Sequence, residues 1–98
     1  MAKRVDPNGV EPQMVLAAAD FSGARVLEIG SGNGRLTFRL AEAARSLVGV
    51  DLKLEELTSA SLHSPEHLRL AVRFVCASAT SQPFRHARFD IAVLASAL

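Results

Sequence analysis

The sequence has no tryptophan or tyrosine, and it has a single cysteine, Cys76. One cysteine cannot form an internal disulfide framework, so we expect a small core side chain in a reducing compartment. No apolar run approaches the ~20 residues that a membrane-spanning helix needs. The first residues also lack the basic and then apolar progression of a secretion signal. These absences predict a cytoplasmic protein without a membrane partner.

The sequence also has little net charge, +1 over 98 residues. A balance so close to neutral argues against a general nucleic-acid surface, although it leaves a local basic patch open. His63 and His67 have the four-residue separation of a helical metal pair, but Pro65 between them interrupts such a helix. No acid or cysteine completes a ligand set there. We therefore expect no metal site.

Three glycines at every second position follow a short apolar run at residues 26–29. They are Gly30, Gly32 and Gly34, and without β-carbons they permit positive φ and close approach of another molecule. The free backbone N–H groups at the start of a following helix would point toward the same space. The pattern predicts a buried strand, a ligand-binding loop and a helix over residues 35–44.

The spacing of these glycines discriminates between ligands. A dinucleotide fingerprint is Gly-x-Gly-x-x-Gly, and Arg35 occupies the position of its third glycine. Glu28 lies two residues before the first glycine, where a carboxylate repels a pyrophosphate and attracts a cation. A cationic ligand is favoured, and an NAD-dependent oxidoreductase is the less favoured alternative.

The pattern Glu28-x-Gly30-x-Gly32-x-Gly34 resembles the first motif of class I S-adenosylmethionine-dependent methyltransferases. The cofactor of that family carries a sulfonium and an α-ammonium group but no phosphate, in agreement with the charge argument. The resemblance implies S-adenosylmethionine as the cofactor. The residues that it implies for cofactor binding are Glu28, Gly30, Ser31, Gly32, Asn33, Gly34, Asp51, Leu52, Ser78 and Ala79.

Asp51 ends a second apolar run at residues 46–51 and lies 21 positions after Gly30. At this distance a parallel βαβ unit brings the end of its second strand beside the first loop. A carboxylate there can accept hydrogen bonds from both ribose hydroxyls. Formation of a turn or a helix cap is the alternative role for an acid at a strand end, and we favour the ribose role because of the glycine motif upstream.

The segment after a third expected strand at residues 72–76 departs from the family. Aligning Gln82-Pro83-Phe84 with the Leu-Pro-Phe of the family places Ser78 where an acid would hold the adenine amino group. A hydroxyl can still hydrogen-bond adenine, but it lacks the charge.

The end of the sequence bears on the methyl acceptor. Phe89-Asp90 before an apolar run is similar to small-molecule methyltransferases of the ubiquinone/menaquinone-biosynthesis type. The Asn-Pro-Pro-Tyr or Asp-Pro-Pro-Tyr of amino-directed nucleic-acid methyltransferases does not occur in the sequence. A small-molecule acceptor of unknown identity is implied, and no catalytic residue is assigned.

The expected fold is α/β, a Rossmann-like parallel sheet of order 3-2-1-4 with helices on both faces. We expect a flexible arm at residues 1–9 and a partial methyltransferase domain at 10–98, with helices at 10–19, 35–44 and 52–63 and a fourth strand at 89–94. Four strands are about half of such a domain, so the sheet is incomplete and its fourth strand is an open apolar edge that invites pairing. A truncated, non-catalytic fragment or interaction module is therefore the alternative to an enzyme.

Overall fold

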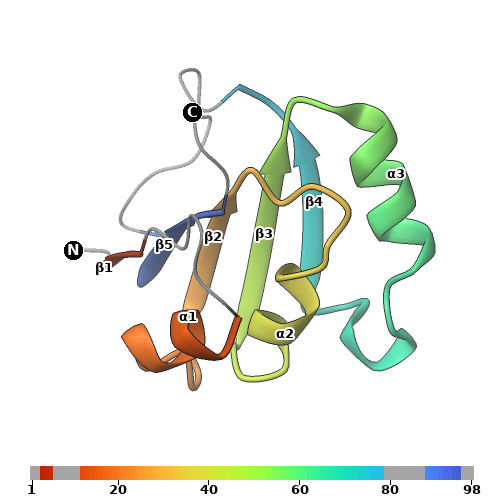
Figure 1. Ribbon diagram of the computed structural model, residues 1–98. Helices are drawn as coiled ribbons and strands as arrows, with labels where there is room; N and C mark the ends of the chain where they lie inside the picture. The colour runs from red at the N-terminus through yellow and green to blue at the C-terminus, as the bar shows by residue number, and fades with distance from the viewer. Residues whose placement is uncertain (1–2, 6–11, 79–87, 96–98) are drawn as a thin grey trace.

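The computed structural model of the chain describes residues 3–5, 12–78 and 88–95. Its strands form one five-stranded sheet in which every pairing is parallel (Figure 1). None of the described helices is long and apolar enough to cross a membrane. The elements are β1 (Lys3–Val5), α1 (Pro12–Ala18), β2 (Arg25–Ile29), α2 (Thr37–Ala41), β3 (Ser46–Asp51), α3 (Leu54–Leu62), the 3-10 helix η1 (Glu66–Leu68), β4 (Val72–Cys76) and β5 (Ile91–Leu94).

The sheet has the order β1-β5-β2-β3-β4. Its four main strands follow the predicted 3-2-1-4 arrangement, and the bounds of β3 and β4 match the prediction. Side chains alternate between the two faces of the sheet, so Val26 and Glu28 share a face with their partners Leu47 and Gly49. The same face receives Val93 from β5. The Rossmann-like α/β fold is confirmed.

The edge of β5 is not open, which corrects one prediction. Lys3–Val5 pairs in parallel with β5, in the register Lys3↔Ile91 to Val5↔Val93. The expectation of a flexible arm is therefore wrong for these three residues. The sequence of these residues did not predict the pairing, because their apolar content is low. Pairing at the edge of a sheet depends on backbone N–H and C=O groups and not on the burial of side chains.

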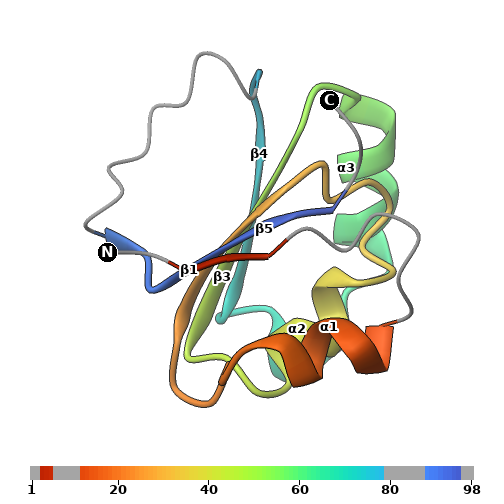
Figure 2. The same cartoon turned by 60° about the vertical axis from the view of Figure 1, so that its left-hand side comes forward.

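The three α-helices all lie on one face of the sheet, as the two views of Figures 1 and 2 show. Val15 of α1 and Leu40 of α2 are buried there against Val26 and Leu47. The opposite face carries a second cluster around Leu27, Ile29 and Val50 to which none of the described helices contributes. The expected helical cover of both faces is thus found on one face in the described part of the chain.

The helices α2 and α3 are shorter than predicted, whereas the first two residues of the helix predicted at 10–19 lie outside the described residues. α2 begins at Thr37 and not directly after Gly34, because residues 35 and 36 form a turn. α3 begins at Leu54 instead of residue 52, since Asp51 and Lys53 close a turn before it. The boundaries moved because turn chemistry at each helix start outweighed the apolar periodicity from which they were predicted.

An ion pair joins β2 and β5 where both strands begin. The Asp90 carboxylate accepts hydrogen bonds from the Arg25 backbone N–H at 2.9 Å and from the Arg25 guanidinium at 3.2 Å. In return, the Asp90 N–H donates to the Arg25 carbonyl oxygen at 2.8 Å. These hydrogen bonds lower the pKa of Asp90 and raise that of Arg25. Reciprocal hydrogen bonds between Arg25 and Asp90 therefore join β2 to β5 at the amino end of the sheet.

Candidate cofactor-binding site

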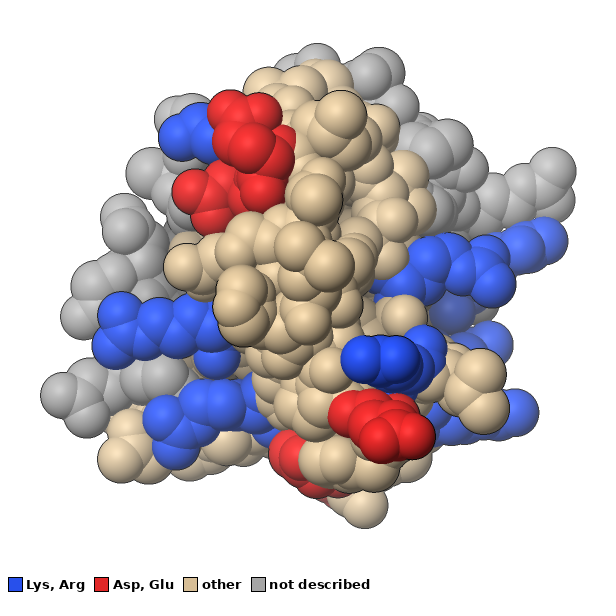
Figure 3. All heavy atoms as spheres, turned by 90° about the vertical axis from the view of Figure 1, so that its right-hand side faces the viewer, with Lys and Arg blue, Asp and Glu red and all other residues tan. Residues whose placement is uncertain are grey.

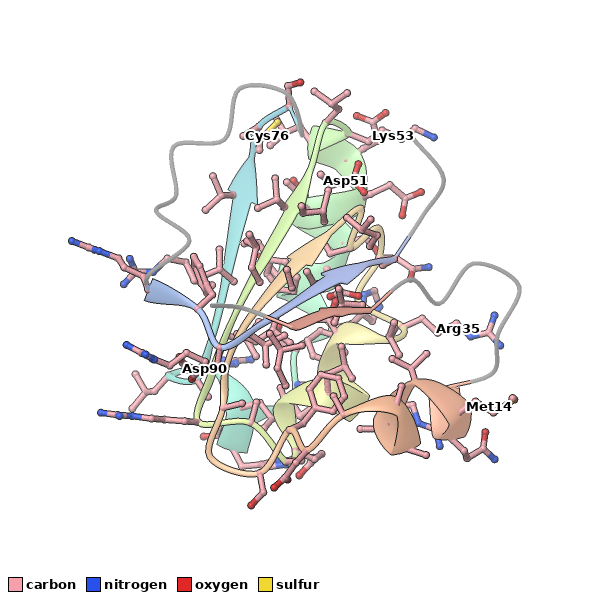
Figure 4. All side chains as sticks on the ribbon, turned by 90° about the vertical axis from the view of Figure 1, so that its left-hand side faces the viewer. Met14, Arg35, Asp51, Lys53, Cys76 and Asp90 are labelled. Atoms are coloured by element: carbon pink, nitrogen blue, oxygen red, sulfur yellow. The ribbon has the colours of Figure 1, made fainter. Side chains whose placement is uncertain are left out.

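The carboxyl ends of the parallel strands meet at one edge of the sheet, opposite the Arg25–Asp90 pair. Backbone hydrogen bonds join the segments that leave them: Gly30 N–H donates to the Val50 carbonyl at 2.7 Å, and Ala77 N–H donates to the Asp51 carbonyl at 3.1 Å. Figure 4 shows Asp51 and Lys53 at this end of the molecule and Asp90 at the other. In open α/β sheets, ligands bind outside this edge.

The glycine loop takes the backbone conformations that its sequence predicts. Gly30, Gly32 and Gly34 have φ of +81°, +58° and +90°. A β-carbon at Gly34 would lie 2.7 Å from the Phe38 ring and 3.3 Å from Ala60, so this glycine seats the loop on α2 and α3. A β-carbon at Gly32 would meet nothing within 4 Å. The loop is therefore packed at Gly34 and faces open space at Gly32.

A glycine in β3 makes room for the loop, which the sequence reasoning missed. A β-carbon at Gly49 would lie 3.0 Å from the Ser31 β-carbon and 3.1 Å from the Phe74 ring. The available signal was a lone glycine inside a strand, which often marks a close approach of neighbouring groups. Ser31 is consequently buried, and its Oγ has no hydrogen-bond partner in the described structure.

Glu28 lies beneath the loop, fully buried on the helix side of β2. Its Oε1 accepts a hydrogen bond from the Thr37 hydroxyl of α2, whereas its Oε2 has no hydrogen-bond partner among the residues that the structure describes. Burial raises the pKa of Glu28 to about 7; the Thr37 hydroxyl opposes the shift and the charge of Asp51 adds to it. No feature of the sequence singled out Thr37 as this partner.

Asp51 holds the loop from the end of β3. Its Oδ2 accepts a hydrogen bond from the Gly32 N–H at 2.8 Å, and its Oδ1 accepts one from the Lys53 N–H at 2.9 Å. The turn role that the sequence left open is therefore present. Each carboxylate oxygen can accept a second hydrogen bond, so these contacts leave capacity for a ligand. The ribose role of Asp51 stays a prediction.

The remaining predicted residues lie around the same edge. The Asn33 side chain accepts a hydrogen bond from the Arg35 N–H at 3.2 Å, and the Leu52 side chain is exposed, at 68%. Ser78 follows β4 and is half-buried, while Ala79 lies outside the described residues. Their contacts with a cofactor stay predictions.

Cys76 is exposed, so its prediction as a core residue is wrong. It stands at the end of β4, which is an edge strand, and its thiol lies 3.4 Å from the Leu52 carbonyl oxygen.

The two histidines that have the spacing of a metal pair contact different groups. A ring nitrogen of His63 lies 2.8 Å from the Ser59 carbonyl oxygen, and one of His67 lies 2.7 Å from the Glu42 carboxylate. Within the described ranges, no three potential metal ligands come together.

The chemistry of this edge fits S-adenosylmethionine better than a dinucleotide. The unpartnered Oε2 of buried Glu28 is a site that a positive charge would stabilise, and Asp51 adds a second carboxylate at the rim. The Glu28 carboxylate beside the glycine loop disfavours a pyrophosphate by like-charge repulsion, whereas an acid at the position of Asp51 suits the ribose of either cofactor. The space beyond Gly32 lets a ligand approach the backbone.

Comparison with known proteins gives the family. A profile of the methyltransferase domain matches residues 26–98. Among curated relatives, an arsenite methyltransferase from Aquipseudomonas alcaligenes is 39% identical over 75 residues, which are 74% of this chain and 20% of that protein. A ubiquinone biosynthesis O-methyltransferase from Methylococcus capsulatus is 33% identical over 87 residues, covering 86% of this chain and 35% of that protein.

Among solved structures, the YcgJ protein from Bacillus subtilis superposes with a TM-score of 0.75 at 30% sequence identity, covering 83% of this chain and 35% of that one. The chain thus spans about a fifth to a third of the length of the proteins that it matches. The profile match includes all of β2 after Arg25, the glycine loop and Asp51, which build the carboxyl edge described above. The chain belongs to the methyltransferase domain family, in the class I, S-adenosylmethionine-dependent group that its first motif resembles.

Proposed function

We propose that this chain binds S-adenosylmethionine at the carboxyl edge of its sheet and forms the cofactor-binding part of a methyltransferase. The observation that carries the proposal is the buried carboxylate of Glu28, which precedes the glycine loop by two residues and has one oxygen without a partner in the described part of the chain. Buried polar groups are normally paired, and an exception at a predicted ligand site points to a positive charge on the ligand that stabilises the carboxylate through the loop.

In this proposal, Asp51 receives the ribose hydroxyls. The N–H groups of Gly32 and Lys53 fix both oxygens of its carboxylate, so little conformational freedom is lost when a ligand binds. Removing a charged acceptor of this kind costs about 1.5–3 kcal/mol of binding free energy. Leu52, exposed next to it, offers apolar surface to the base, and Ser78 with Ala79 is proposed at the adenine end.

Glu28 acts from below the loop. Its side chain is 0% exposed, so it contributes its charge and holds Thr37, and thereby the start of α2, against β2. A positive charge above the loop favours the ionised form of this carboxylate. Gly30, Ser31, Gly32, Asn33 and Gly34 form the surface that the cofactor covers.

When bound, S-adenosylmethionine supplies a methyl group activated by its sulfonium. The chain's own contribution is to hold and orient that cofactor, because methyl transfer is an in-line displacement that depends on positioning. The acceptor is proposed to be a small molecule, in a cytoplasmic protein. The names of the relatives support this class of acceptor, since they include arsenite and ubiquinone-biosynthesis methyltransferases.

A non-catalytic fragment or interaction module is the second candidate. Cofactor binding distinguishes the two candidates, because only the first requires it.

NAD-dependent hydride transfer is disfavoured by the charge of Glu28. It is also disfavoured by Arg35, which takes the position of the third glycine in the dinucleotide fingerprint.

Calorimetric titration of the purified chain with S-adenosylmethionine tests the proposal, with NAD as the control and circular dichroism to establish folding. We expect binding of the first ligand and none of the second. A folded chain that binds neither would remove the cofactor role and favour the non-catalytic fragment or interaction module.

A further inference from the structure

An aromatic pair on the helix side of the sheet joins α2 to β4. The rings of Phe38 and Phe74 meet edge to face, with centroids 6.1 Å apart and ring planes at 86°. Phe74 points to the helix side because its register partner is Gly49, which in turn pairs with Glu28. In this geometry the positive edge of one ring lies against the negative face of the other. The pair therefore stabilises one arrangement of α2 relative to β4.

The Phe38 ring supports the end of the glycine loop. A β-carbon at Gly34 would lie 2.7 Å and 2.9 Å from two atoms of this ring, so the ring lies directly against the backbone. The Phe38 N–H donates to the Gly34 carbonyl oxygen at 3.2 Å, and the Gly34 N–H donates to the Ser31 carbonyl oxygen at 3.2 Å. Phe38 thus fixes the point at which the loop passes into α2.

The Phe74 ring fills space beneath the start of the same loop. A β-carbon at Gly49 would lie 3.1 Å from the Phe74 ring and 3.0 Å from the Ser31 β-carbon, so both side chains converge on this position. Ser31 is also tied to β3, because its N–H donates to the Val50 carbonyl oxygen at 3.1 Å. A side chain smaller than Phe74 would leave part of this space unfilled. Ser31 would then be less tightly confined.

We propose that Phe74 is a positioning residue for cofactor binding, which acts through Phe38 and Ser31 to hold the glycine loop in the conformation that receives S-adenosylmethionine. The inference rests on the proposed function, because it assumes that the loop binds this cofactor. Glycine has wide conformational freedom, so a loop with three glycines at positive φ depends on its neighbours for its shape. A loop held by packed side chains loses less conformational entropy when a ligand binds.

The side of the molecule formed by β4 and α3 suits a test by substitution. Phe74 is half-buried on β4, the outer strand of the described sheet. Figure 3 views this side, on which uncharged atoms run down the middle and charged ones lie mainly at the margins. Because Phe74→Leu replaces one apolar side chain by another, it leaves the charges near the loop unchanged. An effect on cofactor binding would then come from the loss of the ring.

Calorimetric titration of Phe74→Leu with S-adenosylmethionine is the first measurement. We expect the affinity to fall about tenfold, because the apparent affinity decreases with the fraction of molecules whose loop has the binding conformation. Phe38→Leu removes the other ring of the pair and should also weaken binding. It takes the place of the first variant if circular dichroism shows that Phe74→Leu does not fold.

Amide hydrogen exchange without the cofactor is the second measurement. The Ser31 and Gly34 amides, whose hydrogen bonds shape the loop, should exchange about tenfold faster in Phe74→Leu because the loop opens locally more often. Leu68→Ala is the control, since Leu68 is buried in the core cluster around Leu40 and lies before β4. It should lower the overall stability but leave the affinity and the two exchange rates unchanged. Ile91→Val is a milder control of the same kind.

The outcomes separate this inference from the proposed function. A wild type that binds S-adenosylmethionine, together with a folded Phe74→Leu of equal affinity and unchanged exchange, would overturn the positioning role and leave the proposed function intact. Equal losses of affinity in Phe74→Leu and the control would also overturn it, because general destabilisation would then explain the effect. A folded wild type that does not bind the cofactor would reject the proposed function, and the positioning role with it.

Discussion

The two ends of the sheet treat their acidic residues in opposite ways. At the amino end, Asp90 is exposed, and both oxygens of its carboxylate accept hydrogen bonds from the backbone or side chain of Arg25. At the carboxyl end, Glu28 and Ser31 are buried, and neither the Glu28 Oε2 nor the Ser31 hydroxyl has a hydrogen-bond partner within the described ranges. The pKa of Asp90 is lowered by its hydrogen bonds to Arg25, and that of Glu28 is raised to about 7 by burial.

The difference in hydrogen bonding indicates a structural role for Asp90 and a ligand-binding role for Glu28. A carboxylate with all its partners ties two strands together and gives stability, whereas a buried one without a partner costs stability until something binds. The two acids therefore make opposite predictions for the dependence of stability on pH. The incomplete pairing of Glu28 also predicts that a bound cofactor affects the carboxyl end of the sheet and not the amino end.

The largest expected effect concerns the packing beneath the glycine loop. Gly34→Ala places a methyl group against Phe38 at a φ of +90°, and backbone strain with overpacking should cost about 2–5 kcal/mol of unfolding free energy. Gly32→Ala is the matched control, because it has positive φ but open space, and it should cost about 1–2 kcal/mol. Urea denaturation measures both. Equal costs would show that the loop is not seated on α2 and α3.

The next effect concerns Glu28 and has a defined sign. The unfolded chain releases this proton near pH 4.5 and the folded chain retains it until about pH 7, so the native state binds more protons in that window. The stability of the wild type should fall by about 3 kcal/mol as pH rises through it. Glu28→Gln removes this loss. The free energy of unfolding of the variant, measured by urea denaturation, should therefore rise relative to that of the wild type between pH 4.5 and 7. Parallel stability curves would contradict the raised pKa.

The carboxylate of Asp51 gives the third effect, on binding. Asp51→Ala should weaken the affinity for S-adenosylmethionine about tenfold or more, because a charged acceptor for the ribose is lost. Asp90→Ala removes a carboxylate from the amino end and should leave the affinity unchanged. Calorimetry measures both dissociation constants. Unchanged affinity in Asp51→Ala would remove the ribose assignment and leave Asp51 as a residue that only holds the loop.

The smallest effect is expected for Asp90→Asn. Both partners of the Arg25–Asp90 pair are exposed, so salt screens their interaction. Because the pKa of Asp90 is lowered, its contribution is present above pH 4 and is lost as pH falls through the lowered value. The difference in melting temperature between the wild type and Asp90→Asn should therefore shrink in acid. A difference that grows as pH falls would contradict this account.

The parts of the fold that depend on apolar patterning were predictable. The strands β3 and β4 and the parallel order follow from short apolar runs separated by helical periodicity, and the positive φ of Gly30, Gly32 and Gly34 follows from their spacing. The pairing of Lys3–Val5 with β5 was not predictable in this way, since it rests on backbone hydrogen bonds that carry little side-chain signal.

The candidate site was predictable as a location but not in its contacts. The positions of Glu28 and Asp51 at strand ends follow from the sequence, whereas their partners do not. The Thr37 hydroxyl reaches Glu28 only because α2 packs on the sheet with its first residue next to β2, and Gly49 matters only because Ser31 lies against it. Contacts of this kind depend on how elements pack and not on the periodicity within one element.

The measurement that tests the central claim most directly is a two-dimensional amide NMR spectrum of the isotopically labelled chain, recorded with and without S-adenosylmethionine. We expect chemical-shift changes at the carboxyl edge, above all for the Gly32 amide that donates to Asp51, with the Arg25 and Asp90 amides unchanged. Changes confined to the amino end, or a spectrum of a folded chain that does not respond to the cofactor, would contradict it.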